Sequence, residues 1–188
     1  MVLSKNMQKL VAGSSTIRKL FEEGIELAKE VGAENVYDFS LGNPAAPVPE
    51  EVKKSIYDIL ENRNANFVHC YMPNAGYPEV REKVAANLNK KYNSSFTKDD
   101  IIMTVGAAGG INCVLRSLLE PEDEVLCFAP FFGEYNSYVM NFGGNLKVVP
   151  ADYETFQLNV EEADKYITER TKAVIINNPN NPSGVVYN

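Results

Sequence analysis

Apolar residues in the first half of the chain recur at the spacing of amphipathic helices. From residue 16 to Gly32 they fall every three or four positions, behind serines that can cap a helix, so a helix is expected there. Further helices are expected over 50–61 and over 78–92, where Pro78 suits a first helical turn. Residues 62–76 are rich in Asn, Pro and Gly and show no period, which predicts a long loop.

From residue 100 onward, short apolar runs alternate with helical patterns. Apolar runs, each expected to be a strand, occupy 101–105, 124–129, 146–149 and 172–177. Helices are expected between them, over 107–119, up to Met140, and over 160–168. Strands that alternate with helices at this rhythm are typical of βαβ units, so the pattern predicts an α/β fold with a mainly parallel sheet.

Composition and charge narrow the classes of function. The 188 residues are 45% hydrophobic and 23% charged, which is ordinary for a globular protein. The net charge of −7 argues against nucleic acid or a membrane as a partner, since both require clustered Lys and Arg. No signal peptide or membrane-spanning run is visible, and three widely spaced cysteines with a single histidine, His69, predict no metal site and fit a cytoplasmic location.

The first candidate site lies where the run at 101–105 meets the following helix. Gly106, Ala107 and Ala108 stand at this junction, and two further glycines follow them. Small residues let a ligand approach the backbone, and the start of a helix offers unpaired N–H groups to a phosphate. A tight turn without a ligand is the alternative.

Two further candidate segments follow later apolar runs, where ligands of open α/β sheets bind. Phe131 and Phe132 follow the run at 124–129; one of them can form a wall for a flat ring while the other packs in the core. The segment 177–184, with its asparagines and prolines, follows the run at 172–177. Its amides can hydrogen-bond a polar ring substituent, or the segment can be merely a rigid turn.

Together with Ser-Leu-Gly-Asn-Pro at 40–44 and the segment from Tyr71 to Arg81, these segments resemble, in order, the class I/II aminotransferases of pyridoxal-phosphate fold type I, the aspartate aminotransferase superfamily. The most specific match is Asn-Pro-Asn-Asn-Pro-Ser-Gly at 178–184, where Ser183 replaces the threonine of the family motif. The resemblance implies a three-layer αβα large domain, here incomplete. It divides the chain into an N-terminal arm and small-domain segment, 1–48, and the first half of the cofactor-binding large domain, 49–188.

The resemblance implies pyridoxal 5′-phosphate as the cofactor and a role for each matching residue. Backbone N–H groups of Gly106, Ala107 and Ala108 are expected to bind the phosphate. Phe132 is expected to stack on the pyridine ring, and Asn181 to hydrogen-bond the ring's 3-hydroxyl oxygen.

Other roles implied by the resemblance involve the substrate and a second subunit. Tyr71 is expected to cross a homodimer interface to the neighbouring cofactor phosphate. Gly42 is expected near the substrate carboxylate, and Ile17 over the substrate. The lysine that forms a Schiff base with the cofactor is expected beyond Asn188, so no catalytic residue is assigned within the chain and the isolated chain is expected to be inactive.

The function implied is transfer of an amino group between an amino acid, with aspartate as a candidate, and a 2-keto acid. A lyase or decarboxylase of the same fold type and a non-catalytic cofactor-binding domain stay open as alternatives. An unrelated nucleotide-binding domain is disfavoured, because neither a GxGxxG nor a P-loop pattern occurs.

Overall fold

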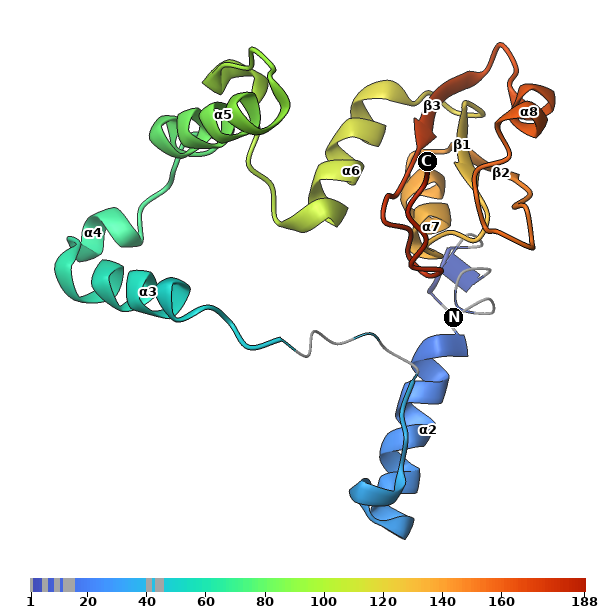
Figure 1. The fold of residues 1–188 in the computed structure, drawn as a ribbon, viewed down its shortest axis with the longest axis horizontal. Coiled ribbons are helices and arrows are strands. Elements are labelled where there is room, and N and C mark those ends of the chain that lie inside the picture. The colour runs from blue at the N-terminus through green and yellow to red at the C-terminus, as the bar shows by residue number, and fades with distance from the viewer. Residues whose placement is uncertain (1, 5–6, 9–10, 12–15, 40–41, 43–45) are drawn as a thin grey trace. The chain divides into compact units, whose positions relative to one another are not determined.

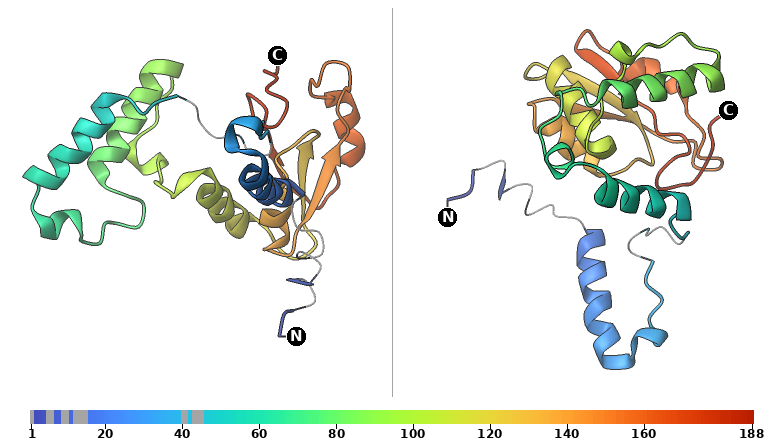
Figure 2. Two further views of the ribbon diagram at one scale, coloured as in Figure 1. Left: turned by 90° about the horizontal axis from the view of Figure 1, so that it is seen from below. Right: turned by 90° about the vertical axis from the view of Figure 1, so that its left-hand side faces the viewer.

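The computed structural model describes the chain except for residues 1, 5–6, 9–10, 12–15, 40–41 and 43–45 (Figure 1). The described residues form two compact units, Met1–Cys70 and Tyr71–Asn188. The first is helical, and the second contains both helices and a sheet (Figures 1 and 2). No helix in the described residues combines the length and the apolar character needed to cross a membrane.

The first unit holds the helices α2 (Thr16–Val31), η1 (Ala33–Asn35), α3 (Glu50–Asn62) and α4 (Ala65–Val68). Helices α2 and α3 confirm the two helices expected from the apolar spacing. Acidic residues fill the first turn of α3, where they complement the helix dipole.

The expected loop at 62–76 is interrupted by α4, so that part of the prediction is wrong. The side chain of Asn64 accepts a hydrogen bond from the backbone N–H of Asn66 at 2.8 Å and thereby caps a single helical turn. Asparagine is common both in loops and at the N-cap of helices, so the sequence pattern alone does not tell which of the two forms here.

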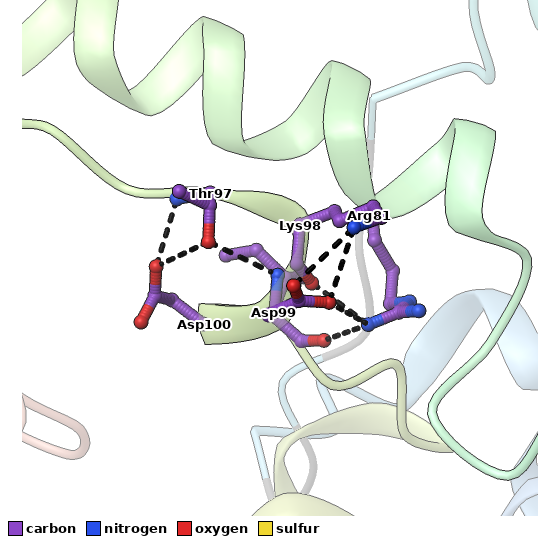
Figure 3. A network of polar contacts seen from close by, with 6 residues as sticks. Arg81, Thr97, Lys98, Asp99 and Asp100 are labelled. Carbon is purple, nitrogen blue, oxygen red and sulfur yellow. Dashed lines mark hydrogen bonds and ion pairs between the residues drawn. The ribbon is translucent and has the colours of Figure 1, made fainter.

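The second unit begins with α5 (Pro78–Tyr92) and η2 (Lys98–Asp100), and α5 has the predicted bounds. Pro78 occupies the first turn of α5, and Asn93 ends the helix in the left-handed conformation with φ of 52°. A capping box starts η2: Asp100 accepts hydrogen bonds from the N–H and hydroxyl of Thr97, each at 2.8 Å (Figure 3). These bonds hold the pKa of Asp100 below its ordinary value.

Arg81 joins α5 to the segment that follows η2 (Figure 3). Its Nη1 donates to the carbonyl of Lys98 at 2.8 Å and, more weakly, to the carbonyl of Ile101 at 3.4 Å. The same atom lies 3.9 Å from the carboxylate of Asp99, which is largely exposed. The guanidinium thus satisfies backbone carbonyls that no strand partner takes up.

The strand expected at 101–105 is absent, and this part of the prediction is wrong. The segment is extended, but its backbone groups have partners outside any ladder. The N–H of Met103 donates to the carbonyl of Ala75 at 2.9 Å, and the carbonyl of Ile101 accepts from Arg81. An apolar run predicts a strand only when another strand is available beside it.

The rest of the unit alternates helices with parallel strands: α6 (Gly106–Leu118), β1 (Glu124–Phe128), α7 (Glu134–Met140), β2 (Asn145–Val149), α8 (Val160–Ala163), η3 (Asp164–Tyr166) and β3 (Thr171–Ile175). The strand order is β2-β1-β3, and both pairings are parallel. Cys127 of β1 lies opposite Val148 on one side and Ile175 on the other. The α/β class with a parallel sheet is therefore confirmed.

The central strand β1 is buried throughout, and its alternating side chains serve two cores. On one face, Val125 packs with residues of α6 and α7, among them Leu115 and Val139. On the other face, Leu126 and Phe128 pack with Val149 and with Ala163 of α8. Helices thus cover both faces of the sheet in three layers, and Figure 2 shows α6 and α8 on opposite sides of the strands.

The single helix expected over 160–168 is shorter and divided. It begins as α8, where the side chain of Asn159 accepts from the N–H of Glu162 at 3.2 Å, and continues as η3. Ile167 is already extended. The chain leaves the helix early because it must turn into β3 at Thr171.

Candidate functional site

The loops that follow β1 and β3 are held together at the carboxyl edge of the sheet. The two strands are neighbours, so their ends emerge side by side. The side-chain nitrogen of Asn180, in the loop after β3, donates to the carbonyl of Pro130, in the loop after β1, at 3.1 Å. This hydrogen bond joins two of the three segments that the sequence selected as candidate sites.

The loop after β3 is a closed turn built around Asn180, which is 6% exposed. Its side-chain oxygen accepts from the N–H and hydroxyl of Ser183 at 3.0 and 2.8 Å. Its backbone N–H donates to the carbonyl of Val185 at 2.9 Å, and its carbonyl accepts from the N–H of Gly184 at 2.8 Å. The turn is therefore rigid without any ligand.

Asn181 is exposed on this rigid turn, next to the buried Asn180. When the amide of Asn177 is oriented so that both its ends are satisfied, its oxygen accepts from the backbone N–H of Asn181 at 3.1 Å, and its nitrogen donates to the carbonyl of Pro179 at 3.1 Å. The backbone of Asn181 is thus fixed while its side chain faces solvent.

The two phenylalanines after β1 differ in exposure. Phe131 is partly buried and lines a small cavity, whereas Phe132 is 37% exposed. The ring of Phe132 meets the ring of the buried Tyr135 edge to face, at 5.6 Å between centroids and 81° between planes. Tyr135 therefore supports the orientation of the exposed ring.

The cavity beneath these loops has a volume of about 10 Å³, room for about one water molecule, so it is not a ligand site itself. Residues of both loops and of the strand ends line it, including Cys127, Phe131, Tyr135, Asn180 and Tyr187. Burial raises the pKa of the Cys127 thiol to about 12, and it also raises the pKa values of the Tyr135 and Tyr187 hydroxyls. These groups stay neutral at physiological pH and act as packing, not as acids or bases.

The third candidate segment is the start of α6. Gly106 has φ of 69°, a left-handed conformation that glycine adopts without strain, and a Cβ there would meet open space. Its N–H donates to the carbonyl of Thr104 at 3.1 Å, and the Thr104 hydroxyl donates to the carbonyl of Gly106 at 3.0 Å. Ala107 and Ala108 are exposed, and no side chain in the described part of the chain caps the helix. The N–H groups of Ala107 and Ala108 are therefore available to an anion, whereas that of Gly106 is already bonded to Thr104.

The amino terminus of α6 faces the carboxyl edge of the sheet, where the loops after β1 and β3 also lie. Helix α6 ends at Leu118, and after a short turn β1 begins at Glu124, with Leu115 of the helix packed against Val125 of the strand. A helix that packs back on the next strand runs antiparallel to it, so its amino terminus faces the carboxyl edge of the sheet.

The remaining candidates lie elsewhere in the chain. Tyr71 is fully exposed at the beginning of the second unit. Gly42 belongs to the first unit, and its Cβ position is open, but its neighbours at 40–41 and 43–45 lie outside the described residues. Ile17 lies in α2, and its side chain is likewise outside the described part of the structure.

Sequence reasoning did not single out Asn180 or Tyr135 for the work they do. Both belong to candidate segments. However, Asn180 is one of several asparagines in its segment and Tyr135 follows two phenylalanines, so residue type alone did not indicate that these two side chains would be buried. Their partners are Pro130 and Phe132. Within the described residues, no cluster of three histidine, cysteine or acidic side chains could hold a metal ion.

Comparison with known proteins gives a consistent result for nearly the whole chain. The family described as "Aminotransferase class I and II" matches residues 33–188. The probable aspartate/prephenate aminotransferase of Aquifex aeolicus is 35% identical over 163 residues, which are 85% of this chain and 40% of that protein. The aromatic-amino-acid aminotransferase 2 of Thermococcus litoralis is 37% identical over 189 residues, 99% of this chain and 45% of that protein.

Solved structures agree with the sequence relatives. An aminotransferase from Eubacterium rectale superposes with a TM-score of 0.94 at 40% identity, over 100% of this chain and 48% of that one. A double mutant of the Thermus thermophilus aspartate aminotransferase superposes with a TM-score of 0.86 at 30% identity, over 100% of this chain and 47% of that one. The chain thus spans less than half the length of the relatives that it matches.

Proposed function

This chain belongs to the aminotransferase class I and II family, and from that membership we propose that it is the amino-terminal portion of an enzyme that binds pyridoxal 5′-phosphate and moves an amino group between an amino acid and a 2-keto acid. The observation that carries the proposal is the hydrogen bond from Asn180 to Pro130. It brings an exposed aromatic ring and an exposed amide, Phe132 and Asn181, to one edge of the sheet.

The start of α6 fits the phosphate of this cofactor. A phosphate needs several donors and a positive local field, and an uncapped helix start supplies both. The left-handed turn at Gly106 leaves the space above it open, so a phosphate could approach the N–H groups of Ala107 and Ala108. Neither alanine offers a hydroxyl, so the backbone would bind alone.

The loops after β1 and β3 fit the ring of the cofactor. Phe132 presents an exposed ring that Tyr135 supports from the side, which suits stacking on a flat heteroaromatic. Asn181 presents an exposed amide on a backbone fixed by Asn177, and an amide N–H can donate to a ring oxygen.

When bound, pyridoxal 5′-phosphate supplies an aldehyde carbon that can take up an amino group and a ring that withdraws electrons from it. The residues of this chain would position the cofactor and would not transfer protons. The first turn of α6 would anchor one end of the site, Phe132 would hold the plane of the ring, and Asn181 would fix its rotation within that plane. Together these residues would hold the cofactor in one orientation relative to a base.

The base, a lysine, is proposed to lie in the part of the protein that relatives carry beyond the stretch matched here. We therefore propose that residues 1–188 alone do not catalyse transamination. The division into an arm and small-domain segment, 1–48, and the first half of the cofactor domain, 49–188, is part of the same proposal.

Substrate and partner assignments complete the proposal. Tyr71, fully exposed, would reach the phosphate of a second subunit in a homodimer, and Gly42 and Ile17 would lie at the substrate. An acidic amino acid such as aspartate is the proposed donor, since several relatives at 30% identity or more are named aspartate aminotransferases. The three widely spaced cysteines fit a cytoplasmic location.

The test begins with the gene, whose reading frame past the codon for Asn188 should encode the expected lysine. The complete gene product is then titrated with pyridoxal 5′-phosphate and with pyridoxal, which lacks the phosphate. Ala107→Pro removes one N–H from the first turn of α6, where proline is tolerated, so it should weaken binding of the phosphate form by about five-fold or more. Binding of pyridoxal should not change.

Ala108→Ser is the matched variant in the same turn. It adds a hydroxyl donor and should tighten binding of the phosphate form by a similar factor. Equal effects of Ala107→Pro on both ligands would place the phosphate elsewhere and overturn the assignment of this turn.

A further inference from the structure

The side chain of Asn180 is buried at the carboxyl edge of the sheet, between the two loops that carry Phe132 and Asn181. It is 6% exposed, and both ends of its amide have partners within the protein: Pro130 at the nitrogen, and Ser183, twice, at the oxygen. A buried amide with all these partners cannot itself contact a ligand. Its effect on a ligand must pass through its neighbours.

The neighbours of Asn180 are the two residues proposed to hold the ring. On one side it is followed directly by Asn181. On the other side it holds the carbonyl of Pro130, two residues before Phe132, across a separation of 50 residues in the sequence. The backbone of Asn181 is fixed to its own loop by Asn177, and Phe132 is fixed to its own helix by Tyr135. The Asn180–Pro130 bond connects these two local supports.

We infer that Asn180 is a positioning residue that sets the spacing between the ring of Phe132 and the amide of Asn181, and through it the hydrogen bond to the cofactor's ring oxygen. The inference rests on the proposed function and adds a residue to it. It requires an amide: the nitrogen must donate to Pro130 while the oxygen accepts from Ser183. A carboxylate of the same shape keeps the second contact but turns an acceptor toward the carbonyl of Pro130.

The inference is tested with Asn180→Asp in the complete gene product. Three ligands are titrated: pyridoxal 5′-phosphate, its 3-deoxy analogue, which lacks the ring oxygen, and pyridoxal, which lacks the phosphate. In the unaltered protein, the ring oxygen should improve affinity by about five-fold, the effect of one hydrogen bond. In Asn180→Asp this preference should fall to about one-fold, while the preference for the phosphate over the non-phosphate form stays unchanged.

Asn178→Asp is the matched control. Asn178 is an exposed asparagine of the same loop whose side-chain oxygen accepts from the N–H of Tyr187 at 3.0 Å, and aspartate preserves that contact. The variant makes the same change of charge without touching Pro130. It should keep the preference for the ring oxygen.

Asn180→Ala provides a second variant, because it removes the donor without placing a charge beside Pro130. An unchanged preference for the ring oxygen in either folded variant overturns the inference and leaves the proposed function standing. If neither variant unfolds cooperatively, Asn180 is a requirement of the whole fold, and the positioning role is overturned as well. If the unaltered protein binds none of the three ligands, the proposed function fails and this inference fails with it.

Discussion

Replacing Arg81 by methionine tests whether its two carbonyl contacts or its ion pair stabilises the second unit. Methionine keeps an apolar stem of similar length, so packing is largely preserved. The substitution removes the contact with Lys98 at 2.8 Å, the contact with Ile101 at 3.4 Å and the ion pair with Asp99 (Figure 3).

The magnitude follows from the geometry of these contacts. A charged donor at 2.8 Å from a carbonyl contributes about 1.5–3 kcal/mol, whereas a contact at 3.4 Å is longer than usual and adds little. The Asp99 side chain is 73% exposed and 3.9 Å away, so the ion pair contributes at most about 0.5 kcal/mol. Among the residues that the structure describes, none is a hydrogen-bond partner for the buried Nε of Arg81, a cost that methionine removes. The net loss expected for Arg81→Met is therefore about 2 kcal/mol.

Urea denaturation measures this loss directly. The chain has 10 tyrosines and no tryptophan, so tyrosine fluorescence and circular dichroism are the two signals, and their coincidence checks two-state behaviour. The control is Asp99→Asn, which removes the ion pair with Arg81 and an exposed ion pair with Lys98 at 3.3 Å, and leaves both carbonyl contacts of Arg81 in place. It should lower the free energy of unfolding by less than about 0.5 kcal/mol. If Asp99→Asn costs as much as Arg81→Met, the ion pair and not the carbonyl contacts joins α5 to η2, and the reasoning is refuted.

Two further predictions concern other contacts of the second unit. Gly76→Ala should destabilise the protein by about 2 kcal/mol, because Gly76 has φ of 94° and an added Cβ would lie 2.5 Å from Cγ of Met103. Gly133→Ala is the neutral control in the same urea assay, since Gly133 has φ of −54° and an added Cβ would meet open space. Thr168→Val should raise the pKa of Glu124 toward its ordinary value of 4.5, since the Thr168 hydroxyl is the main cause that lowers it. The lowered pKa stabilises the folded state above pH 4.5, and this stabilisation is lost as pH falls through the folded-state pKa. The loss in free energy of unfolding caused by Thr168→Val should therefore be larger at pH 7 than at pH 3. An equal loss at both pH values would contradict this prediction.

Local signals in the sequence were sufficient for the long helices α3, α5 and α6 and for the central strand. Pro78 and the lysine pair near Tyr92 bracket α5, and the buried run from Glu124 to Phe128 is apolar enough to be recognised without any partner. These elements depend on residues that are close in the sequence. Their bounds could therefore be predicted within one or two positions.

The two main errors have different causes. The apolar run at 101–105 has the composition of a strand, but Ala75 and Arg81, distant in the sequence, occupy its hydrogen-bonding groups, and a window along the chain does not contain the identity of such partners. The long loop gains a helical turn for a local reason, because Asn64 caps it, and an asparagine in such a segment suits a loop and a helix start equally well.

The candidate site shows the same division. The residue types at Gly106, Phe132 and Asn181 marked each segment as suited to a ligand, and the structure leaves all three accessible. The burial of Asn180 could not be foreseen, because it depends on a carbonyl 50 residues earlier. The sequence pattern therefore identifies exposed residues suited to a ligand more readily than it identifies the buried contacts that position those residues.

The strand order β2-β1-β3 has a consequence for how the sheet assembles during synthesis. The central strand, β1, is translated first, and the two strands that flank it follow it in the chain. Each later strand therefore leaves the ribosome when the edge that it joins already exists, and neither has to wait for a segment still to be made. The pairing with β2 joins residues that are nearer in the sequence than the pairing with β3, since Glu124 lies opposite Asn145 on one side and Thr171 on the other, so the β1–β2 pair is favoured to form first.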